Sequence, residues 1–410
     1  TNVLQIKGAD TQFNVGTGRL NVGFSGDSTG VVTVDNGLLT VASNLSLAEG
    51  NTASTFGIVN LNGGIVRPNV IVAGSGGGNS IFNFNGGTLQ ANIGSTGFMG
   101  GLTQANIYSG GAILDSNGWS VTISQALQPA AGNGVSNIPV TTGGAGYLGA
   151  PVVKITGGGG TGATAVATIS GGVVTGIEIT SAGTGYTSAP TITFVGGGAT
   201  SAASPGTPSI TANAADGGVT KVGLGTVTLS GASSYLATTT VNEGELAVTN
   251  LQANGTASSL GSGTQVLING GSLKYTGGSN NNGFNRTITV GSNGATFDNA
   301  IAGFLCYYGS FVGSDPLNLV DTSYRSGELL VTGDSPGFSG EVNVGNGVTA
   351  SGMVQYRSNN PTPFGTGLIR VNGGGILTSD IGTTTPNTLG NNFALNGGLL
   401  ATQMADINYT

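Results

Sequence analysis

The stretch LGTVTLSGASSYLATTTVNEGELAVTN, residues 224–250, decides the fold of this chain. It contains two short segments joined by a turn and a third segment that begins after Asn-Glu-Gly. Within these segments apolar residues alternate with Thr, Ser or Glu, and a period of two is the pattern of a half-buried β-strand. Helical spacing of apolar residues is not sustained, so the stretch predicts short strands joined by turns.

Fainter versions of the same phrase recur along the chain. Each has Asn or a substitute, then Gly, then alternating apolar residues: VDNGLLTV (34–41), LNGGIVR (61–67), FNGGTLQA (84–91), YSGGAIL (108–114), VNEGELAV (241–248), INGGSLKY (268–275), VNGGGILT (371–378) and LNGGLLA (395–401). Where the phrases follow one another, their Gly markers are 23–27 residues apart. A period near 24 predicts an all-β chain that forms a parallel β-helix, or β-solenoid, with one period per coil. The alternative is a meander of separate Asn-Gly hairpins, which gives no reason for a fixed spacing.

The asparagines of this phrase hold the same place in their coils. Strands of successive coils stack about 4.8 Å apart, so equivalent side chains form ladders along the solenoid. We therefore expect a structural ladder of Asn36, Asn62, Asn85, Asn269, Asn372 and Asn396.

The composition removes several classes of protein. Of 410 residues, 79 are Gly and only 7% are charged, whereas an ordinary soluble domain is about a quarter charged. The apolar fraction of 38% is too high for a disordered chain, so the glycines belong at repeated turns. No run of 18 apolar residues occurs, and no membrane-spanning helix is expected.

Residues 128–214 depart from the 24-residue period. Tyr147 and Tyr186 are 39 residues apart, as are Pro151 and Pro190, so this segment is its own two-copy duplication. We predict three parts: the first part of the solenoid (1–127), an inserted duplicated β module (128–214) that projects from it and is dispensable for its fold, and the second part of the solenoid (215–410). We expect Tyr147 and Tyr186 to pack onto the two prolines, and the alternative is that they form an aromatic platform for a surface glycan.

Two resemblances are carried by these motifs. KVGLGTVTLSGASSYLATTTVNEGELAVTN (221–250), with a degenerate copy at 326–347, resembles the autotransporter-associated β-strand repeat of secreted bacterial proteins. The resemblance implies a right-handed parallel β-helix in an extracellular or bacterial cell-surface location. The inserted module resembles the Gly-x-Gly-Tyr-x-x-x-Pro repeats of bacterial and phage surface proteins, a resemblance that names no ligand.

Reactive groups are sparse. The chain has no histidine, which excludes Ser-His-Asp and Cys-His catalysis and imidazole-bound zinc. Ten dispersed Lys and Arg residues argue against nucleic acid as a partner. Clustered carboxylates occur at Glu243 with Glu245 and at Asp315 with Asp321, the latter near Arg325, and they are the only candidates for a polysaccharide lyase or hydrolase. We interpret them as solvated strand faces and turn caps, and we expect no catalytic residue, no metal and no cofactor.

Cys306 has no partner for an intramolecular disulfide. We expect it to be a buried small apolar residue, with an intermolecular bridge as the alternative.

Two functions follow from these expectations. The first is a structural subunit of a bacterial surface fibre, assembled head to tail with copies of itself through the edges of its end coils, which carry little charge or proline to block pairing. The second is an adhesin or glycan-binding surface protein that uses the inserted module, and a lyase or hydrolase is a distant third.

Overall fold

The computed structural model describes residues 1–50, 52–323, 327–347, 353–356, 362–379 and 389–402. All regular structure in these residues is strand, and the chain forms a β-solenoid of about 15 turns with parallel stacked strands. The predicted all-β solenoid is confirmed, and a hairpin meander is wrong for the repeats. The right-handed sense of the solenoid stays a prediction. No described segment is a helix long and apolar enough to cross a membrane.

The chain divides into two compact units. Unit 1 comprises Thr1–Ile93, Phe98–Ile113 and Leu127–Gly217, and unit 2 comprises Gly94–Gly97, Leu114–Ala126 and Gly218–Thr410. Two strands, β10 (Ser95–Gly100) and β12 (Ala112–Asp115), pass from one unit to the other.

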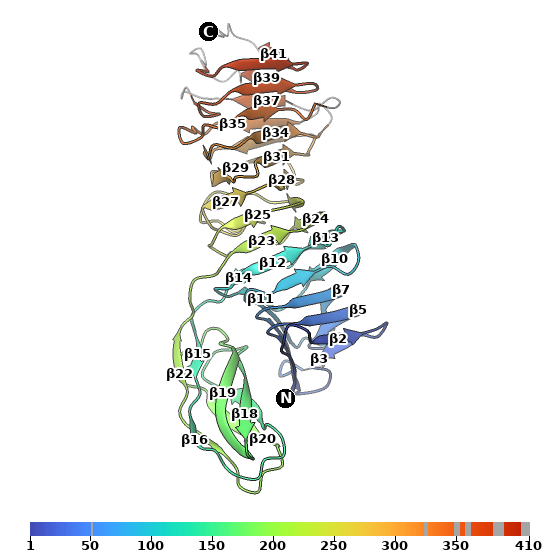
Figure 1. Ribbon diagram of the computed structural model, residues 1–410, viewed down its shortest axis with the longest axis vertical. Helices are drawn as coiled ribbons and strands as arrows, with labels where there is room; N and C mark the ends of the chain where they lie inside the picture. Colours follow the sequence, from blue (N-terminus) through green and yellow to red (C-terminus); the bar gives the residue numbers. More distant parts are fainter. Residues whose placement is uncertain (51, 324–326, 348–352, 357–361, 380–388, 403–410) are drawn as a thin grey trace. The chain divides into compact units, whose positions relative to one another are not determined.

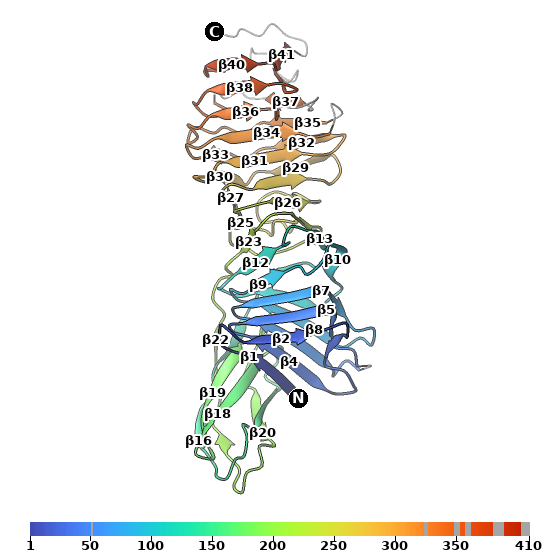
Figure 2. The same ribbon diagram turned by 45° about the vertical axis from the view of Figure 1, so that its right-hand side comes forward.

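In unit 1 a parallel sheet, named sheet A, forms one side of the solenoid (Figure 2). Thr29 pairs with Phe56, and Phe56 pairs with Asn79, so successive coils are 27 and 23 residues long, close to the predicted period. The strands of sheet A are β1 (Asn2–Ile6), β4 (Thr29–Val34), β6 (Phe56–Leu61), β8 (Asn79–Phe84), β11 (Gln104–Ile107) and β14 (Gln128–Pro129).

The rest of each coil in unit 1 is a bent strand. The pairing of β5 (Leu38–Leu47) with β7 (Ile65–Ala73) shifts between Val41 and Asn44. The first half of β5 pairs with β2 (Gln12–Val15) and the second half with β3 (Leu20–Val22). β9 (Thr88–Gln90) pairs with β7 and continues this stack. Each coil therefore has three strand segments: one in sheet A and the two halves of the bent strand.

Unit 2 repeats the same stacking. Its strands are β13 (Ser120–Ile123), β23 (Val219–Val222), β24 (Thr226–Leu229), β25 (Thr239–Val241), β26 (Glu245–Val248), β27 (Gln265–Ile268), β28 (Ser272–Tyr275), β29 (Asn280–Phe284), β30 (Thr287–Val290), β31 (Ala295–Asn299), β32 (Phe304–Tyr307), β33 (Phe311–Val312), β34 (Leu317–Asp321), β35 (Glu328–Val331), β36 (Val342–Val344), β37 (Met353–Tyr356), β38 (Ile369–Asn372), β39 (Ile376–Ser379), β40 (Phe393–Asn396) and β41 (Leu399–Thr402). Figure 1 shows β35, β37, β39 and β41 stacked in order. β13 pairs in parallel with β24, so the stack continues directly across the 128–214 insertion.

The core of each unit consists of ladders of apolar side chains inside the coils. In unit 2 the register aligns Leu246, Leu273, Phe297 and Leu319, and all four are 0% exposed. Each coil buries its apolar face only against its neighbours, which is the reason for the repeat.

The Lys-x-Gly-x-Gly pattern that precedes the stretch 224–250 forms a turn around a buried lysine. Nζ of Lys221 donates to the carbonyl oxygens of Val222 at 2.7 Å and Glu243 at 3.3 Å, and also to that of Gly223. Burial lowers the pKa of this ammonium, and the three carbonyls replace the water that it loses. The long side chain of Lys221 thus bonds carbonyls of two successive coils.

The Asn-Gly turns need glycine for close backbone approach. Gly64 has a φ of +61°, and a Cβ there would lie 2.3 Å from the carbonyl oxygen of Gly37 in the preceding coil. No other residue fits without moving one of the two coils.

The inserted module is antiparallel throughout. A four-stranded sheet has the order β19-β18-β17-β20, and two small ladders, β15 with β22 and β16 with β21, connect it to the solenoid. Its strands are β15 (Asn133–Asn137), β16 (Val140–Thr142), β17 (Val152–Thr156), β18 (Thr164–Ser170), β19 (Val173–Ser181), β20 (Thr191–Val195), β21 (Ser204–Pro205) and β22 (Ser209–Ala212). Gln128 and Pro129 still pair with sheet A, so the strands of the module begin only at Asn133.

Candidate functional site

The duplication in the module gives it a local two-fold arrangement. β17 pairs with β20 so that Lys154 lies opposite Thr193, its equivalent 39 residues later. The flanking pairs are related by the same 39-residue shift: Val152 pairs with Val195, and their equivalents in the other copy, Thr191 and Thr156, pair with each other. The two copies therefore fold around each other as halves of one small domain.

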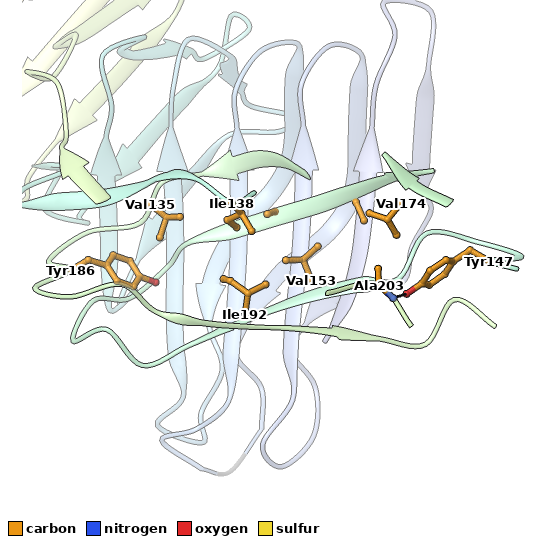
Figure 3. Packing of buried hydrophobic residues seen from close by; sticks show 10 residues of the cluster. Val135, Ile138, Tyr147, Val153, Val174, Tyr186, Ile192 and Ala203 are labelled. Atoms are coloured by element: carbon orange, nitrogen blue, oxygen red, sulfur yellow. Dashed lines mark hydrogen bonds between the residues drawn. The ribbon is translucent and has the colours of Figure 1, made fainter. Parts of the chain in front are cut away.

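Tyr147 and Tyr186 belong to the core of the module. They are 6% and 4% exposed, and Figure 3 shows them at opposite ends of its buried apolar cluster. The hydroxyl of Tyr147 accepts a hydrogen bond from the backbone N–H of Ala203 at 2.8 Å. Burial raises the pKa of the Tyr186 hydroxyl above its ordinary value. The structure does not bring the two rings together into a platform.

Each tyrosine ring lies on the glycine turn of the other copy. A Cβ on Gly160 would lie 2.3 Å from Cδ2 of Tyr186, and a Cβ on Gly197 would lie 2.7 Å from Cδ1 of Tyr147. The glycine clusters at 157–160 and 196–198 are therefore the surfaces that receive the rings.

The module lies against the outer face of sheet A rather than projecting from it, which corrects the prediction from the sequence. Strand β4 alternates between Val32 and Val34, which face the solenoid core, and Val31 and Thr33, which face outward, yet all four are buried. Hydrogen bonds join the two parts: Nδ2 of Asn60 donates to Oγ1 of Thr164 at 2.8 Å. The strands of sheet A pass behind the module in Figure 3.

A buried asparagine ladder supports this docking face. It consists of Asn60, Asn83 and Asn106 on β6, β8 and β11, all at most 2% exposed. Nδ2 of Asn83 donates to Oδ1 of Asn60 at 2.8 Å, and Nδ2 of Asn106 donates to Oδ1 of Asn83 at 2.9 Å. Nδ2 of Asn83 also donates to Oγ of Ser181 at 3.3 Å. The ladder thereby pairs its own amides with one another and also donates to two buried hydroxyl groups of the module, those of Thr164 and Ser181.

Further contacts hold the other margin of the module. Nδ2 of Asn62 donates to the carbonyl oxygen of Thr180 at 2.9 Å, and Lys7 forms an ion pair with Glu178 at 2.8 Å. The ion pair is exposed and contributes little to stability, so the buried amides carry the docking.

An open cleft of about 440 Å³ remains beside the docking contacts. We name it the module cleft. Its solenoid wall is formed by the outer faces of β1, β4 and β6 with Asp27 and Ser54, and its module wall by β17, the turn 157–162, the start of β18, Thr180 and Tyr186. The cleft is the concave feature of unit 1 at which two differently built surfaces meet, and such sites are where ligands usually bind.

The asparagines predicted from the turn phrase have separate roles. Nδ2 of Asn396 donates to Oδ1 of Asn372 at 3.2 Å, and Nδ2 of Asn372 donates to Oδ1 of Asn343 at 3.4 Å, so these form a short ladder. The others cap turns or lie at the surface. Asn85 accepts from the N–H of Gly110, Asn269 accepts from the N–H of Asn293, Asn62 donates to Asp35 and to the module, and Asn36 is exposed.

The carboxylates singled out in the sequence serve local bonds. Glu245 pairs with Lys274 at 3.2 Å, whereas Glu243 is exposed in the turn before β26. Oδ2 of Asp321 accepts from Nδ2 of Asn299 at 2.9 Å, and Asp315 is half-buried in the turn before β34. Arg325 lies outside the described residues.

Two further predictions concern metal and thiol chemistry. Among the residues that the structure describes, no group of three or more Cys, Asp or Glu side chains is placed to hold a metal ion. Cys306 is buried at 5% exposure between Leu305 and Tyr307 in β32, as expected.

Of the residues that build the docking face and the cleft, Asn62 and Tyr186 were singled out from the sequence in other roles, whereas Asn60, Asn83 and Phe56 were not. Asn60 and Asn83 are 23 residues apart and each precedes an Asn-Gly turn by two residues, so their periodicity was available as a signal. Their alternation placed them on the outer face of a strand, and nothing local indicated that another part of the chain covers that face.

No family model matches this chain, and no solved structure matches it. Over 124 residues, 29% of its length, the chain is 36% identical to the adhesin BmaC autotransporter of Brucella suis biovar 1 (strain 1330), and the match spans 4% of that protein. This similarity and the parallel solenoid fit a protein of autotransporter-associated β-helix repeats. The resemblance of the module to Gly-x-Gly-Tyr surface repeats stays a prediction.

Proposed function

We propose that this chain is an adhesin-like part of a bacterial surface protein, in which the solenoid is the scaffold and the module carries the contact surface. The partial similarity to an autotransporter adhesin supports the class and the extracellular location. The observation that carries the proposal is the docking of the module through buried amides of Asn60 and Asn83. A module fixed in this way presents its exposed side in one orientation, which lowers the entropic cost of binding.

The exposed side of the module includes apolar side chains. Leu148 is 90% exposed and Val195 is 50% exposed. Single exposed apolar side chains are normal on a protein surface, so these two are open to a partner without identifying one.

The proposal includes a non-enzymatic role. The carboxylates with raised pKa, Asp298 and Asp321, are buried in unit 2 with hydrogen bonds from Thr322, Ser323 and Asn299. Neither carboxylate lines the module cleft, and the hydrogen bonds to neighbouring residues account for both as structural groups.

The experiment that tests the proposal is attachment of coated beads. Beads that carry the full chain are applied to epithelial monolayers and to plates coated with host glycans, beside beads that carry the chain without residues 128–214. We expect attachment that falls to the level of albumin-coated beads when the module is absent. Attachment that is equal with and without the module would assign the contact to the solenoid and overturn the proposal.

End-to-end assembly into a fibre stays a prediction. Sedimentation of the purified chain at micromolar concentration tests it, since a fibre subunit forms large assemblies and an adhesin segment sediments near its own mass of 39.9 kDa.

A further inference from the structure

The module cleft has an apolar floor and a rim of hydroxyl groups. On the solenoid wall, Val31 and Ile58 are 4% and 3% exposed, and the half-buried ring of Phe56 packs against them. The apolar strip continues to Ile81, and there the module closes over it: a Cβ on Gly162 would lie 3.5 Å from Cδ1 of Ile81. The strip is therefore open toward the cleft and sealed beyond it.

Three hydroxyl groups around this floor are free to bind. Thr29 and Ser54 stand on the solenoid wall and Thr161 on the module wall, and their side chains make no hydrogen bond within the described part of the chain. A hydroxyl both donates and accepts. By contrast, Thr164 and Thr180 are bonded to each other at 2.7 Å and belong to the docking contacts.

The cleft carries little net charge. Its charged side chains are Asp27 and Lys154, one of each sign, and both are exposed at the rim. Such a lining favours neither an anionic nor a cationic ligand.

The floor of the cleft is a strand face. β4 and β6, which carry Val31, Phe56 and Ile58, are each paired on both sides, whereas β1 at the margin of the cleft pairs, among the described strands, only with β4. Strand addition needs an unpaired edge, so a ligand seated on the floor is one that side chains recognise.

From these observations we infer that the module cleft binds a neutral saccharide of one or two rings. A pyranose has an apolar C–H face, which fits the ring of Phe56, and a rim of hydroxyls, which fits Thr29, Ser54 and Thr161. The volume of about 440 Å³ lies at the small end of ligand sites. The inference rests on the proposed function, because it names the ligand class of the surface that the module presents.

The test is a titration of the full chain with defined sugars, in which binding is measured by calorimetry and by saturation-transfer NMR. The probes are glucose, galactose, mannose, N-acetylglucosamine, maltose, lactose and cellobiose, with galacturonate and glucosamine as charged comparators. We expect at least one neutral sugar to bind at millimolar concentration or below and the charged comparators to bind more weakly.

Two variants locate the site. Phe56→Ala removes the apolar platform and is expected to weaken binding about tenfold or more, and Thr161→Val removes one hydroxyl without a change of shape and is expected to weaken it about threefold to tenfold. Phe13→Ala is the matched control, because Phe13 is 39% exposed on β2 and does not line the cleft. If Phe56→Ala fails to fold, the sugar affinity of Thr161→Val decides whether the cleft is the binding site.

The inference is overturned if no neutral sugar binds, if a charged comparator binds best, or if the two variants bind like Phe13→Ala. The bead assay separates this result from the proposed function. Attachment that needs the module but is unchanged by both variants leaves the adhesin proposal intact and removes the saccharide site. If the variants weaken sugar binding but the beads do not attach, the saccharide site stands and the adhesin proposal is removed.

Discussion

Nδ2 of Asn83 donates to Oδ1 of Asn60, one coil earlier, at 2.8 Å, and both side chains are buried between sheet A and the module. The same amide donates to Oγ of Ser181 in the module. One side chain thus takes part both in the stacking of the coils and in the docking of the module.

Asn83→Ala is expected to lower the free energy of unfolding of unit 1 by about 1–3 kcal/mol, because Oδ1 of Asn60 and Nδ2 of Asn106 lose a partner while they stay buried. Urea denaturation measures the change. Asn36→Ala is the control, since Asn36 is exposed and its loss is expected to change stability by less than about 0.5 kcal/mol. Equal values for the two variants would show that the buried ladder adds nothing.

Tyr147→Phe tests the role of the hydroxyl in the module. The N–H of Ala203 donates to it at 2.8 Å, and its removal leaves that N–H buried without a partner, at a cost of about 1–3 kcal/mol. Hydrogen exchange at Ala203, followed by mass spectrometry, is expected to become faster. Leu148→Ala is the control, because Leu148 is 90% exposed, and exchange at Ala203 that does not change in Tyr147→Phe would contradict the assignment.

Acid is expected to favour the folded form of unit 2 through Asp298. Burial raises the pKa of its carboxyl, against hydrogen bonds from Thr322 and the charge of Lys274, which lower it. A carboxyl whose pKa is higher in the folded chain contributes stability below its unfolded pKa of about 3.9, and this contribution is lost as the pH rises through the folded pKa. The free energy of unfolding of the wild type, relative to Asp298→Asn, is therefore expected to increase as the pH falls from neutral, as urea denaturation at several pH values will show.

Glu341→Gln provides the comparison of opposite sign. Hydrogen bonds from Arg370 lower the pKa of Glu341, so its contribution is present above its unfolded pKa of about 4.3 and is lost as the pH falls through the folded value. The wild type is expected to lose stability relative to this variant on acidification. Curves for the two variants that move in the same direction would refute the prediction for Asp298.

Deletion of residues 128–214, with Leu127 joined to Ala215, is expected to keep the β-rich circular dichroism and a cooperative melt. The core side chains Val34, Leu61 and Phe84 are 0% exposed and face the inside of the coils, away from the module. The deletion uncovers the outer face of sheet A, so a lower melting temperature and stronger binding of a hydrophobic dye are also expected. A variant that is insoluble would show that the module is required for the fold of the solenoid.

The sequence predicts the coils well because a solenoid repeats one local rule. Alternation fixes which side chains face inward, and the recurring Asn-Gly fixes where each coil turns, as at Gly37 and Gly64. The docking of the module follows no such rule. Asn60 and Phe56 occupy outward positions of an alternating strand, where the pattern is the same whether water or another part of the chain covers them.

Tyr147 and Tyr186 show the same limit. Their 39-residue spacing identified the duplication, but their burial depends on the glycine turn of the opposite copy. That pairing is a property of the folded module and has no signature in either copy alone.

The reciprocal seating of these two rings has a consequence for how the module folds. Each half supplies the ring that the other half receives, which is the geometry of an isologous two-fold dimer. A single half would therefore have to associate with a second copy of itself, at a rate and to an extent set by its concentration. Joining two halves in tandem turns that association into an intramolecular step, so the two halves pair within one chain however dilute the protein is.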